Sequence, residues 1–131
     1  MEMNNSKKLA GLLDKRGIDA LLVTSPENRF YATGFQSSAG VAVITKEANY
    51  FFTDFRYFEA GQEIEGFEKI MVGRDRNYNS LINKVIEEHN IKRIGFEDAR
   101  TSVSAHRDLE REINAELVGV GDAILMVRSS K

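Results

Sequence analysis

The chain has 131 residues, of which 42% are hydrophobic and 29% are charged, and its formal net charge is −2. This composition is typical of one globular domain and excludes a disordered segment, and the scattered Lys and Arg residues offer no basic stripe to a nucleic acid. The chain has no cysteine, which excludes a disulfide framework, a thiol nucleophile and a cysteine-based zinc site. Its first residues lack the apolar core of a signal peptide, and no window is long and apolar enough to span a membrane, so we expect a cytoplasmic protein without a membrane partner.

The first third of the chain predicts a helix, a strand and a second helix. The first helix begins near residue 5 and ends at Gly17. Its apolar stripe consists of Leu9, Leu12 and Leu13. The uninterrupted apolar run Ala20–Val23 is typical of a strand that is covered on both faces. Ser25 followed by Pro26 predicts the start of the next helix, which ends at Gly34.

The next segment predicts a hairpin followed by a helix. Val41–Thr45 and Tyr50–Thr53 are rich in β-branched and aromatic residues and are joined by a short turn, which favours two antiparallel strands. Asp54 is a natural N-cap, because its carboxylate can accept hydrogen bonds from amide groups of the following turn. We expect a helix from Phe55 to Gly66. Its inner side is predicted to consist of Phe55, Phe58 and Ile64.

The second half of the chain alternates between strands and helices. Strands are expected at Phe67–Val72, Arg93–Glu97 and Leu117–Val120. The helix between the first two of these strands ends near Asn90. Its apolar stripe consists of Leu81, Ile82, Val85, Ile86 and His89. Thr101 or Ser102 caps the last predicted helix, whose inner face is expected to consist of Val103, His106, Leu109 and Ile113.

This order of elements predicts a three-layer α/β domain with a mixed sheet of about six strands that contains one antiparallel hairpin. The only polar gap that would break a helix, Gly73–Asn77, is too short to divide the chain. We therefore expect one domain over residues 1–131.

The residues alone identify no clear metal site. His89 and His106 both lie on predicted apolar stripes, so we interpret them as packed neutral side chains rather than as metal ligands. Acidic residues follow several predicted strands, where sites in open α/β sheets usually collect: Asp54, Glu97, Asp98 and Asp122. Together these carboxylates would suit Mg²⁺-dependent phosphodiester cleavage, which is the hypothesis of a metal nuclease. In the competing interpretation, Asp54 and Asp122 are helix caps and Glu97–Asp98 is a solvated turn.

The residues identify no clear nucleophile or phosphate site either. Ser37 and Ser38 have no histidine near them in sequence and lie outside any Gly-x-Ser-x-Gly element, so we interpret them as small loop residues. The flanking Gly34 and Gly40 lack the spacing of a Walker or dinucleotide motif. Arg56 lies in the first turn of a predicted helix, where it can reach a carboxylate within the chain or across an interface.

Two motifs in combination resemble the amino-terminal domain of the creatinase, prolidase and aminopeptidase P family. The first is Asn-Arg-Phe-Tyr-Ala-Thr-Gly-Phe at residues 28–35, and the second is Thr-Asp-Phe-Arg-Tyr at residues 53–57, behind the hairpin. The resemblance extends over nearly the whole chain, including Gly-Phe-Glu-Asp at residues 95–98 and the closing run Ile124–Lys131.

The resemblance implies an RNase H-like fold of the creatinase N-terminal type, without catalysis of its own. In that family the catalytic centre lies in a carboxyl-terminal pita-bread domain, where two divalent ions, commonly Mn²⁺ or Co²⁺, activate the hydroxide that cleaves an Xaa-Pro bond. Since this chain ends at the Arg128-x-x-Lys131 element that leads into that domain, the metals would belong to a domain outside it. Two residues depart from the family pattern on a packing face: Arg29 replaces the usual Ile or Val, and Ala32 replaces the usual Leu.

The resemblance also implies roles in assembly and in access to the active site. The domain is expected to pack against its own catalytic domain and against a second copy in a homodimer, and to limit substrates to short peptides or unstructured amino termini. The substrate of the full enzyme is expected to be a peptide with proline in the second position. The residues expected nearest to the substrate are Phe35, Gln36, Ser37 and Ser38. Arg56 and Tyr57 are expected to be structural or interface residues, and Asp54 to be a cap or the partner of Arg56. A stand-alone binding or scaffolding module is the alternative, and these residues do not separate the aminopeptidase, dipeptidase and creatinase branches.

Overall fold

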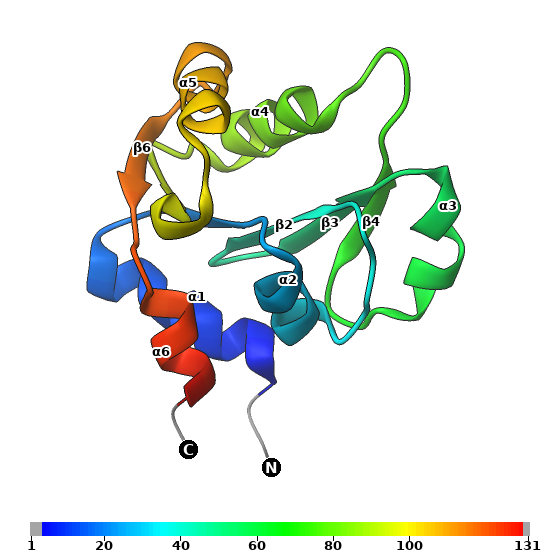
Figure 1. The fold of residues 1–131 in the computed structure, drawn as a ribbon, viewed down its shortest axis with the longest axis horizontal. Coiled ribbons are helices and arrows are strands. Elements are labelled where there is room, and N and C mark those ends of the chain that lie inside the picture. Colours follow the sequence, from blue (N-terminus) through cyan, green and yellow to red (C-terminus); the bar gives the residue numbers. More distant parts are fainter. Residues whose placement is uncertain (1–3, 130–131) are drawn as a thin grey trace.

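Residues 4–129 are described by a computed structural model, and within this range the chain forms three layers, with one six-stranded sheet between two layers of helices (Figure 1). The strands are β1 (Ala20–Val23), β2 (Val41–Thr45), β3 (Asn49–Thr53), β4 (Glu68–Met71), β5 (Arg93–Phe96) and β6 (Glu116–Gly119). The helices are α1 (Asn5–Arg16), α2 (Pro26–Thr33), α3 (Phe55–Phe58), α4 (Tyr78–His89), α5 (Val103–Glu112) and α6 (Ala123–Ser129), with 3₁₀ turns η1 (Ala60–Glu63) and η2 (Asp98–Arg100). The predicted three-layer α/β class is confirmed. Lys131, which closes the predicted Arg-x-x-Lys element, lies outside the described residues.

The strand order in the sheet is β4-β3-β2-β1-β5-β6. Strand β2 runs antiparallel to both of its neighbours, β1 and β3, and the other neighbouring strands pair in parallel. The predicted hairpin is β2–β3, and a second antiparallel pair arises because β2 also lies against β1. All strands except β2 therefore finish at one end of the sheet, which we call the carboxyl end. Val23 pairs with Ala42 and Val41 with Phe52, so β2 begins at this same end.

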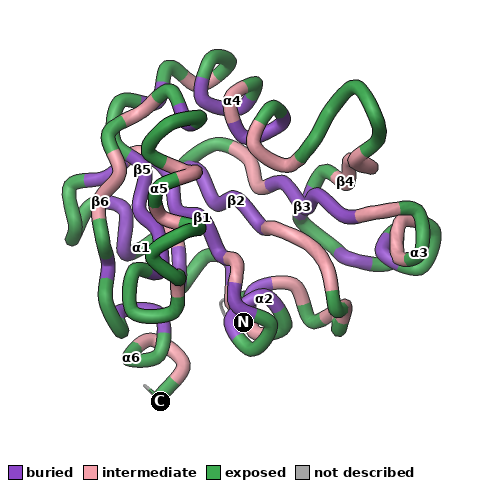
Figure 2. Tube along the Cα trace, turned by 45° about the horizontal axis from the view of Figure 1, so that its top comes forward, coloured by how far each residue is buried: buried purple, intermediate pink, exposed green. Residues whose placement is uncertain are grey.

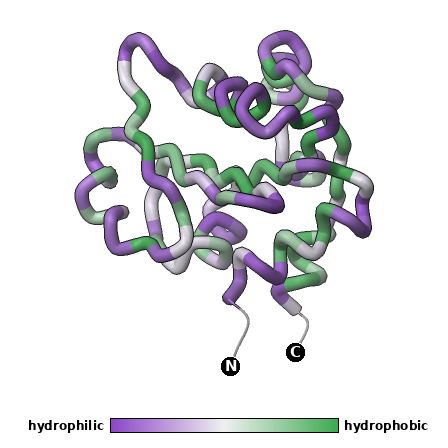
Figure 3. Tube along the Cα trace, turned by 180° about the vertical axis from the view of Figure 1, so that it is seen from behind, coloured by the Kyte–Doolittle hydropathy of each residue, from purple (hydrophilic) through white to green (hydrophobic). Residues whose placement is uncertain are grey.

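An apolar core lies on each face of the sheet, and strands β1 to β3 are buried between the two cores (Figure 2). Helices α1, α2 and α6 cover one face, and α4 and α5 cover the other (Figure 1). Leu21 and Val23 of β1 belong to the first core, and Ala20 and Leu22 belong to the second. Side chains alternate along a strand, which explains why β1 is a continuous apolar run. The hydrophobic strands and the hydrophilic outer surfaces of the helices are visible in Figure 3.

Helices α1 and α4 have the predicted ends. Gly17 and Asn90 follow them in the left-handed backbone region, with φ angles of 64° and 54°, which suits glycine and asparagine. At the opposite ends, the side chains of Asn4 and Asn77 accept hydrogen bonds from backbone N–H groups of the first turn. Across residues 4–129, no helix combines the length and the apolar character needed to cross a membrane.

Two helix predictions are wrong in detail. The helix expected from Phe55 to Gly66 divides into α3 and η1, and the Phe55 side chain is 79% exposed instead of facing inward. Gly61 is buried in η1, and because glycine is a poor helix former, the chain tightens into a 3₁₀ turn there. In α5, Val103 is 69% exposed, whereas Leu109 and the following Ile113 pack on the core. The first turn of α5 is exposed throughout, so its side chains extend past the core.

Candidate functional site

Segments from distant parts of the chain meet at the carboxyl end of the sheet. Thr24 and Ser25 follow β1, Glu97 follows β5, and Asp54 follows β3. The loop of residues 35–40 leads into β2 at the same end. Because five strands run in the same direction, residues as much as 73 positions apart come into hydrogen-bond contact here. This end therefore holds the residues of both sequence motifs and is the candidate functional site.

Glu97 is the buried centre of this site, with 2% of its surface exposed. Its Oε2 accepts hydrogen bonds from the backbone N–H groups of Thr24 at 2.7 Å and Ser25 at 2.9 Å, and from Thr24 Oγ1 at 3.4 Å. Its Oε1 accepts from the Ser25 hydroxyl at 2.7 Å and from Asn28 Nδ2 at 2.6 Å. A buried carboxylate needs such donors in place of water. The prediction of a solvated turn is wrong for Glu97, and the Ser25 hydroxyl binds Glu97 instead of capping α2.

Arg29 is a buried cation in the same region, with 5% of its surface exposed. Its Nη1 donates to the Thr24 carbonyl, and its Nη2 donates to the Ser37 carbonyl at 2.6 Å. Burial lowers the pKa of Arg29, and nearby groups that include Glu97 oppose this shift; because arginine titrates far above neutrality, the side chain stays charged. Ala32 packs in the apolar core as predicted. The expectation of an apolar packing face is wrong at Arg29, whose guanidinium binds two carbonyls.

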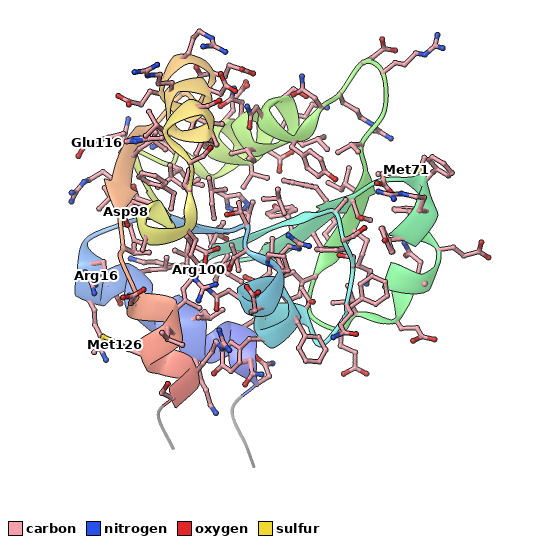
Figure 4. All side chains as sticks on the ribbon, viewed as in Figure 1. Arg16, Met71, Asp98, Arg100, Glu116 and Met126 are labelled. Carbon is pink, nitrogen blue, oxygen red and sulfur yellow. The ribbon has the colours of Figure 1, made fainter. Side chains whose placement is uncertain are left out.

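Asn28 connects Glu97 to the last helix of the described chain. Its side-chain amide donates to Glu97, and its Oδ1 accepts a hydrogen bond from Arg128 Nη1 of α6 at 2.8 Å. On the outer side of α2, Arg100 projects from η2 toward Glu27 and forms an ion pair at 3.0 Å (Figure 4). Helix α2 is thus held by a buried polar network on one side and by a surface ion pair on another.

The loop of residues 35–40 contains the four residues predicted to lie nearest to a substrate. The Phe35 ring meets the rings of Phe51 and Tyr57 edge-on, with centroid distances of 6.1 and 6.4 Å. The Ser38 and Tyr57 hydroxyl groups share a hydrogen bond of 2.6 Å. An open cavity of about 560 Å³ beside the loop is lined by Pro26, Glu27, Phe30, Gln36, Ser37, Ser38, Tyr57 and Arg128. The loop therefore borders a cavity, and its contact with substrate stays a prediction.

Gly40 ends this loop at a close approach to β3. A Cβ atom on Gly40 would lie 3.0 Å from the Phe51 ring and 3.2 Å from the Phe52 carbonyl oxygen. The φ angle of 156° is also one that other residues rarely adopt. Glycine is thus required at the point where the loop enters the sheet.

Asp54, Arg56 and Tyr57 form a connected group on the surface beside the loop. Asp54 Oδ1 accepts a hydrogen bond from the Arg56 backbone N–H at 3.0 Å, and Arg56 Nη2 lies 2.6 Å from Asp54 Oδ2. The Arg56 side-chain hydrogen bond holds the pKa of Asp54 below its usual value, and the hydrogen bond from Ser38 lowers the pKa of Tyr57. The Arg56 guanidinium also lies 5.1 Å from the centre of the Tyr57 ring. Arg56 therefore has a carboxylate partner within the chain, and a role for this group at an interface stays a prediction.

The four acids of the nuclease hypothesis do not form a metal site. Asp54 is paired with Arg56, and the oxygens of Glu97 are occupied by donors. Asp98, which lies near β6 (Figure 4), accepts from the Gly121 backbone N–H at 2.7 Å. Among residues 4–129, no group of three or more His, Cys, Asp or Glu side chains could hold a metal ion. The residues described here do not fit a dinuclear metal centre.

The two histidines contact aromatic rings. His89 Nε2 lies 2.7 Å from the Tyr50 hydroxyl, and the ring is largely buried. His106 packs on Phe96 with a centroid distance of 4.8 Å, and its side chain is 44% exposed. The expected packing is therefore present, although it is only partial for His106.

Sequence reasoning missed the polar network formed by Asn28, Arg29 and Arg128. Two features of the sequence could have indicated Glu97, the centre of this network, and the residues that bind it. Glu97 and the Thr24–Ser25 pair each follow a strand, and parallel neighbouring strands would place them together. The sequence carried no signal that these two strands are neighbours, because 69 to 73 residues separate the partners.

Comparison with known proteins identifies the family. The family described as Creatinase/Prolidase N-terminal domain matches residues 6–130 of the chain. The chain belongs to this family. A curated relative of this Creatinase/Prolidase N-terminal domain is the uncharacterized peptidase YqhT from Bacillus subtilis, which is 38% identical over 130 residues. That match covers 95% of this chain and 35% of YqhT.

Solved structures agree with this assignment. The Xaa-Pro dipeptidase from Bacillus anthracis is 28% identical, with a TM-score of 0.86, over 95% of this chain and 35% of the dipeptidase chain. An Xaa-Pro aminopeptidase structure from Streptococcus pyogenes is also 28% identical, with a TM-score of 0.86, over 95% of both chains. The chain therefore spans about a third of the length of YqhT and of the dipeptidase. A chain of this domain's size has been crystallised by itself in the Streptococcus pyogenes case.

Proposed function

We propose that residues 1–131 are the non-catalytic amino-terminal domain of an Xaa-Pro peptidase and control the access of peptides to a catalytic domain outside this chain. That domain would hold two divalent ions, Mn²⁺ or Co²⁺, which supply the hydroxide for cleavage. The complete enzyme would be a cytoplasmic homodimer that cleaves peptides with proline in the second position. The aminopeptidase and dipeptidase activities are both compatible with this proposal.

One observation carries the proposal. The family match spans residues 6–130, while the same chain covers only 35% of YqhT and of the Bacillus anthracis dipeptidase. A domain of this family is therefore one part of those longer proteins. The described residues also do not fit a dinuclear metal centre, which agrees with catalytic groups in the other part.

The access role is assigned to the loop of residues 35–40. Gln36, Ser37 and Ser38 line the open cavity, and Phe35 packs between the core and Tyr57. In this proposal the loop borders the entrance to the active site and limits the size of the substrate. Exposed Arg56 and half-buried Tyr57 of the second motif would contact the partner copy or the catalytic domain.

An activity assay tests whether catalysis requires the domain outside this chain. The purified 131-residue chain is incubated with Mn²⁺ and an Xaa-Pro dipeptide or tripeptide, alongside the longer protein obtained by reading the gene past Lys131. We expect turnover by the longer protein and none by the chain alone. Turnover by the chain that persists through purification would overturn the proposal, as would a natural stop codon directly after Lys131.

A variant pair in the longer protein tests the access role. Gln36→Ala should raise KM for a tripeptide several-fold and leave kcat within twofold, because the loop would contact the bound peptide without touching the reacting atoms. The matched control is Gln62→Ala in η1, which is exposed and lies outside the cavity. Equal KM values for both variants would remove the loop from the access role. Light scattering on the same samples measures whether the protein is a dimer.

A further inference from the structure

A buried polar network with two arms connects the loop of residues 35–40 to helix α6. Glu97 is its centre, and the arms begin at adjacent residues of α2. Asn28 binds Glu97 and Arg128 of α6 at 2.6 and 2.8 Å. Arg29 binds the carbonyl of Thr24 and the carbonyl of Ser37 in the loop, and the N–H of the Thr24–Ser25 peptide unit donates to Glu97. A continuous path of hydrogen bonds and one peptide unit thus joins the loop to α6, whose Arg128 lines the same open cavity as Ser37.

The Arg29 arm is more costly than an apolar side chain at the same position. Arg29 Nε is buried and, within the described part of the chain, has no hydrogen-bond acceptor. Burying a cation with an unsatisfied donor is unfavourable, and apolar residues of similar volume often replace buried charges without loss of stability. What an apolar side chain cannot supply is a planar fork that binds two carbonyls at once. The specific contribution of Arg29 is therefore the fixed position of the Ser37 peptide relative to Thr24.

The other anchors of the loop lie at its margins. Thr33 Oγ1 accepts from the Phe35 N–H at the start, and Thr53 Oγ1 donates to the Ala39 carbonyl near the end. The hydrogen bond between Ser38 and Tyr57 is exposed to solvent, where water competes for both hydroxyl groups. The partly buried hydrogen bond from Arg29 is thus the central anchor of the loop.

We propose that Glu97, Asn28 and Arg29 are positioning residues that couple the placement of α6 to the conformation of the loop of residues 35–40. When Arg128 no longer binds Asn28, the Asn28 side-chain amide is free to rotate away from Glu97. Oε1 of Glu97 then loses one of its two donors, the Asn28 amide, and keeps the other, the Ser25 hydroxyl. The carboxylate then has one donor fewer and holds the Thr24–Ser25 peptide less firmly, and the carbonyl of this peptide is the inner acceptor of Arg29. The inference rests on the proposed function, since the loop matters for activity only if it borders the substrate.

Nuclear magnetic resonance relaxation of the 131-residue chain tests the coupling. Arg128→Met should lower the backbone order parameters of residues 36–39 from the rigid range of about 0.85 toward the flexible range below about 0.6. Arg29→Met should lower them at least as far. The matched control is Arg100→Met, which removes an arginine that also binds α2 but lies outside the network. Loop order that falls with Arg29→Met and stays unchanged with Arg128→Met would overturn the coupling.

A double-mutant cycle separates coupling from two independent losses. The Arg29→Met and Arg128→Met pair should reduce loop order less than the sum of the single variants, because either one already breaks the path. Arg29→Lys retains the charge without the fork and serves as the second variant if Arg29→Met does not fold. It should restore little of the loop order, and full restoration would contradict the proposal.

The readout distinguishes this inference from the proposed function. Order parameters do not depend on peptidase activity. If the longer protein lacks Xaa-Pro activity but its loop loses order in Arg128→Met, the proposed function is wrong and the coupling stands. In an active longer protein, Arg29→Met, at a residue that does not line the open cavity, should raise KM several-fold with kcat within twofold, and Arg100→Met should change neither. An active protein whose loop stays rigid in Arg128→Met would remove the coupling alone.

Discussion

Asp19 and Glu97 bridge the same pair of parallel strands, β1 and β5, from opposite ends. Asp19 precedes β1 and accepts hydrogen bonds from the backbone N–H groups of residues 92 and 93 at 2.9 and 3.1 Å. Glu97 follows β5 and accepts from those of residues 24 and 25 at 2.7 and 2.9 Å. Each carboxylate thus holds two consecutive amide groups beside the neighbouring strand.

The two bridges differ in their surroundings. Asp19 is only half-buried, and its hydrogen bonds from the Lys92 and Arg93 backbone lower its pKa. Glu97 is 2% exposed and also accepts from the Ser25 hydroxyl and from Asn28 of α2. Asn28 in turn binds Arg128, and the carbonyl of Thr24 binds Arg29. Both carboxylates bridge the two strands, so the difference between them lies in burial. Half-buried Asp19 makes a local connection between strands, whereas buried Glu97 belongs to a long-range network. The following changes test this comparison.

The largest effect is expected from removing the buried bridge. Glu97→Ala should lower the free energy of unfolding by about 3–5 kcal/mol, because it leaves buried donors unsatisfied and Arg29 without its nearby negative charge. Equilibrium unfolding in urea measures the loss. The control is Glu110→Ala, an exposed acid on α5. A loss below about 1 kcal/mol would show that the buried bridge is no stronger than a surface contact.

A second change disturbs the strand pair between the two bridges. In Gly95→Ala the new Cβ would lie 2.6 Å from Ile18 Cδ1 and 3.0 Å from Val120 Cγ1, so overpacking should cost about 1–3 kcal/mol. The control is Gly11→Ala in α1, where no atom lies within 4 Å of the new Cβ and helix propensity should add about 0.5–1 kcal/mol. Thermal unfolding of both variants measures the difference. Equal melting temperatures for Gly95→Ala and Gly11→Ala would mean that strands β1 and β5 can move apart to accommodate the new Cβ.

The exposed bridge should contribute less and should depend on pH. The lowered pKa of Asp19, below 3.8, means that its stabilisation is present at neutral pH and is lost as the pH falls through the folded-state value. Asp19→Asn should therefore cost about 1 kcal/mol or less at pH 7, since solvent screens the charge. The gap between the two proteins should close below pH 4 or so, as followed by urea unfolding across pH. A gap that widens on acidification would contradict this sign.

The smallest effect is expected from an ion pair at the surface. Arg56→Met removes the partner of Asp54, but the Arg56 side chain is 53% exposed, so the free energy of unfolding should change less than in Asp19→Asn. Urea unfolding at two salt concentrations measures the change. The Asp54 cap on the Arg56 backbone N–H remains in this variant. A change as large as that of Glu97→Ala would place this pair with the buried network instead.

Patterns confined to one element were predictable from the sequence. The continuous apolar run of β1 and the stripe of α4 each report their own burial, and Gly17 and Asn90 report where helices end. The α3 segment was not predictable, because exposed Phe55 looks apolar and inward-facing in a sequence pattern. Tertiary placement overrides the pattern when an element is short and lies at the border of the sheet.

The candidate site was only partly predictable. The loop of residues 35–40 and the Asp54–Tyr57 segment stood out as motifs, and their proximity follows from the β2–β3 hairpin. Glu97 was identified as a strand-end acid but was assigned to solvent as one alternative, because its donors lie about 70 positions earlier. Arg29 was placed on a packing face because the family resemblance has Ile or Val at this position, although its partners Thr24 and Ser37 lie only 5 and 8 positions away. Partners that only a non-local strand pair brings together leave no trace in a local pattern.

The separation between Glu97 and its donors has a consequence for synthesis on the ribosome. Thr24 emerges 73 residues before Glu97, an interval of several seconds at about 5–20 residues per second. During that time Thr24 and Asn28 lack the carboxylate that accepts their hydrogen bonds, and β1 has no parallel neighbour. We therefore expect the nascent chain to keep α2 and the following loop unsettled until β5 has left the exit tunnel, and then to acquire both together.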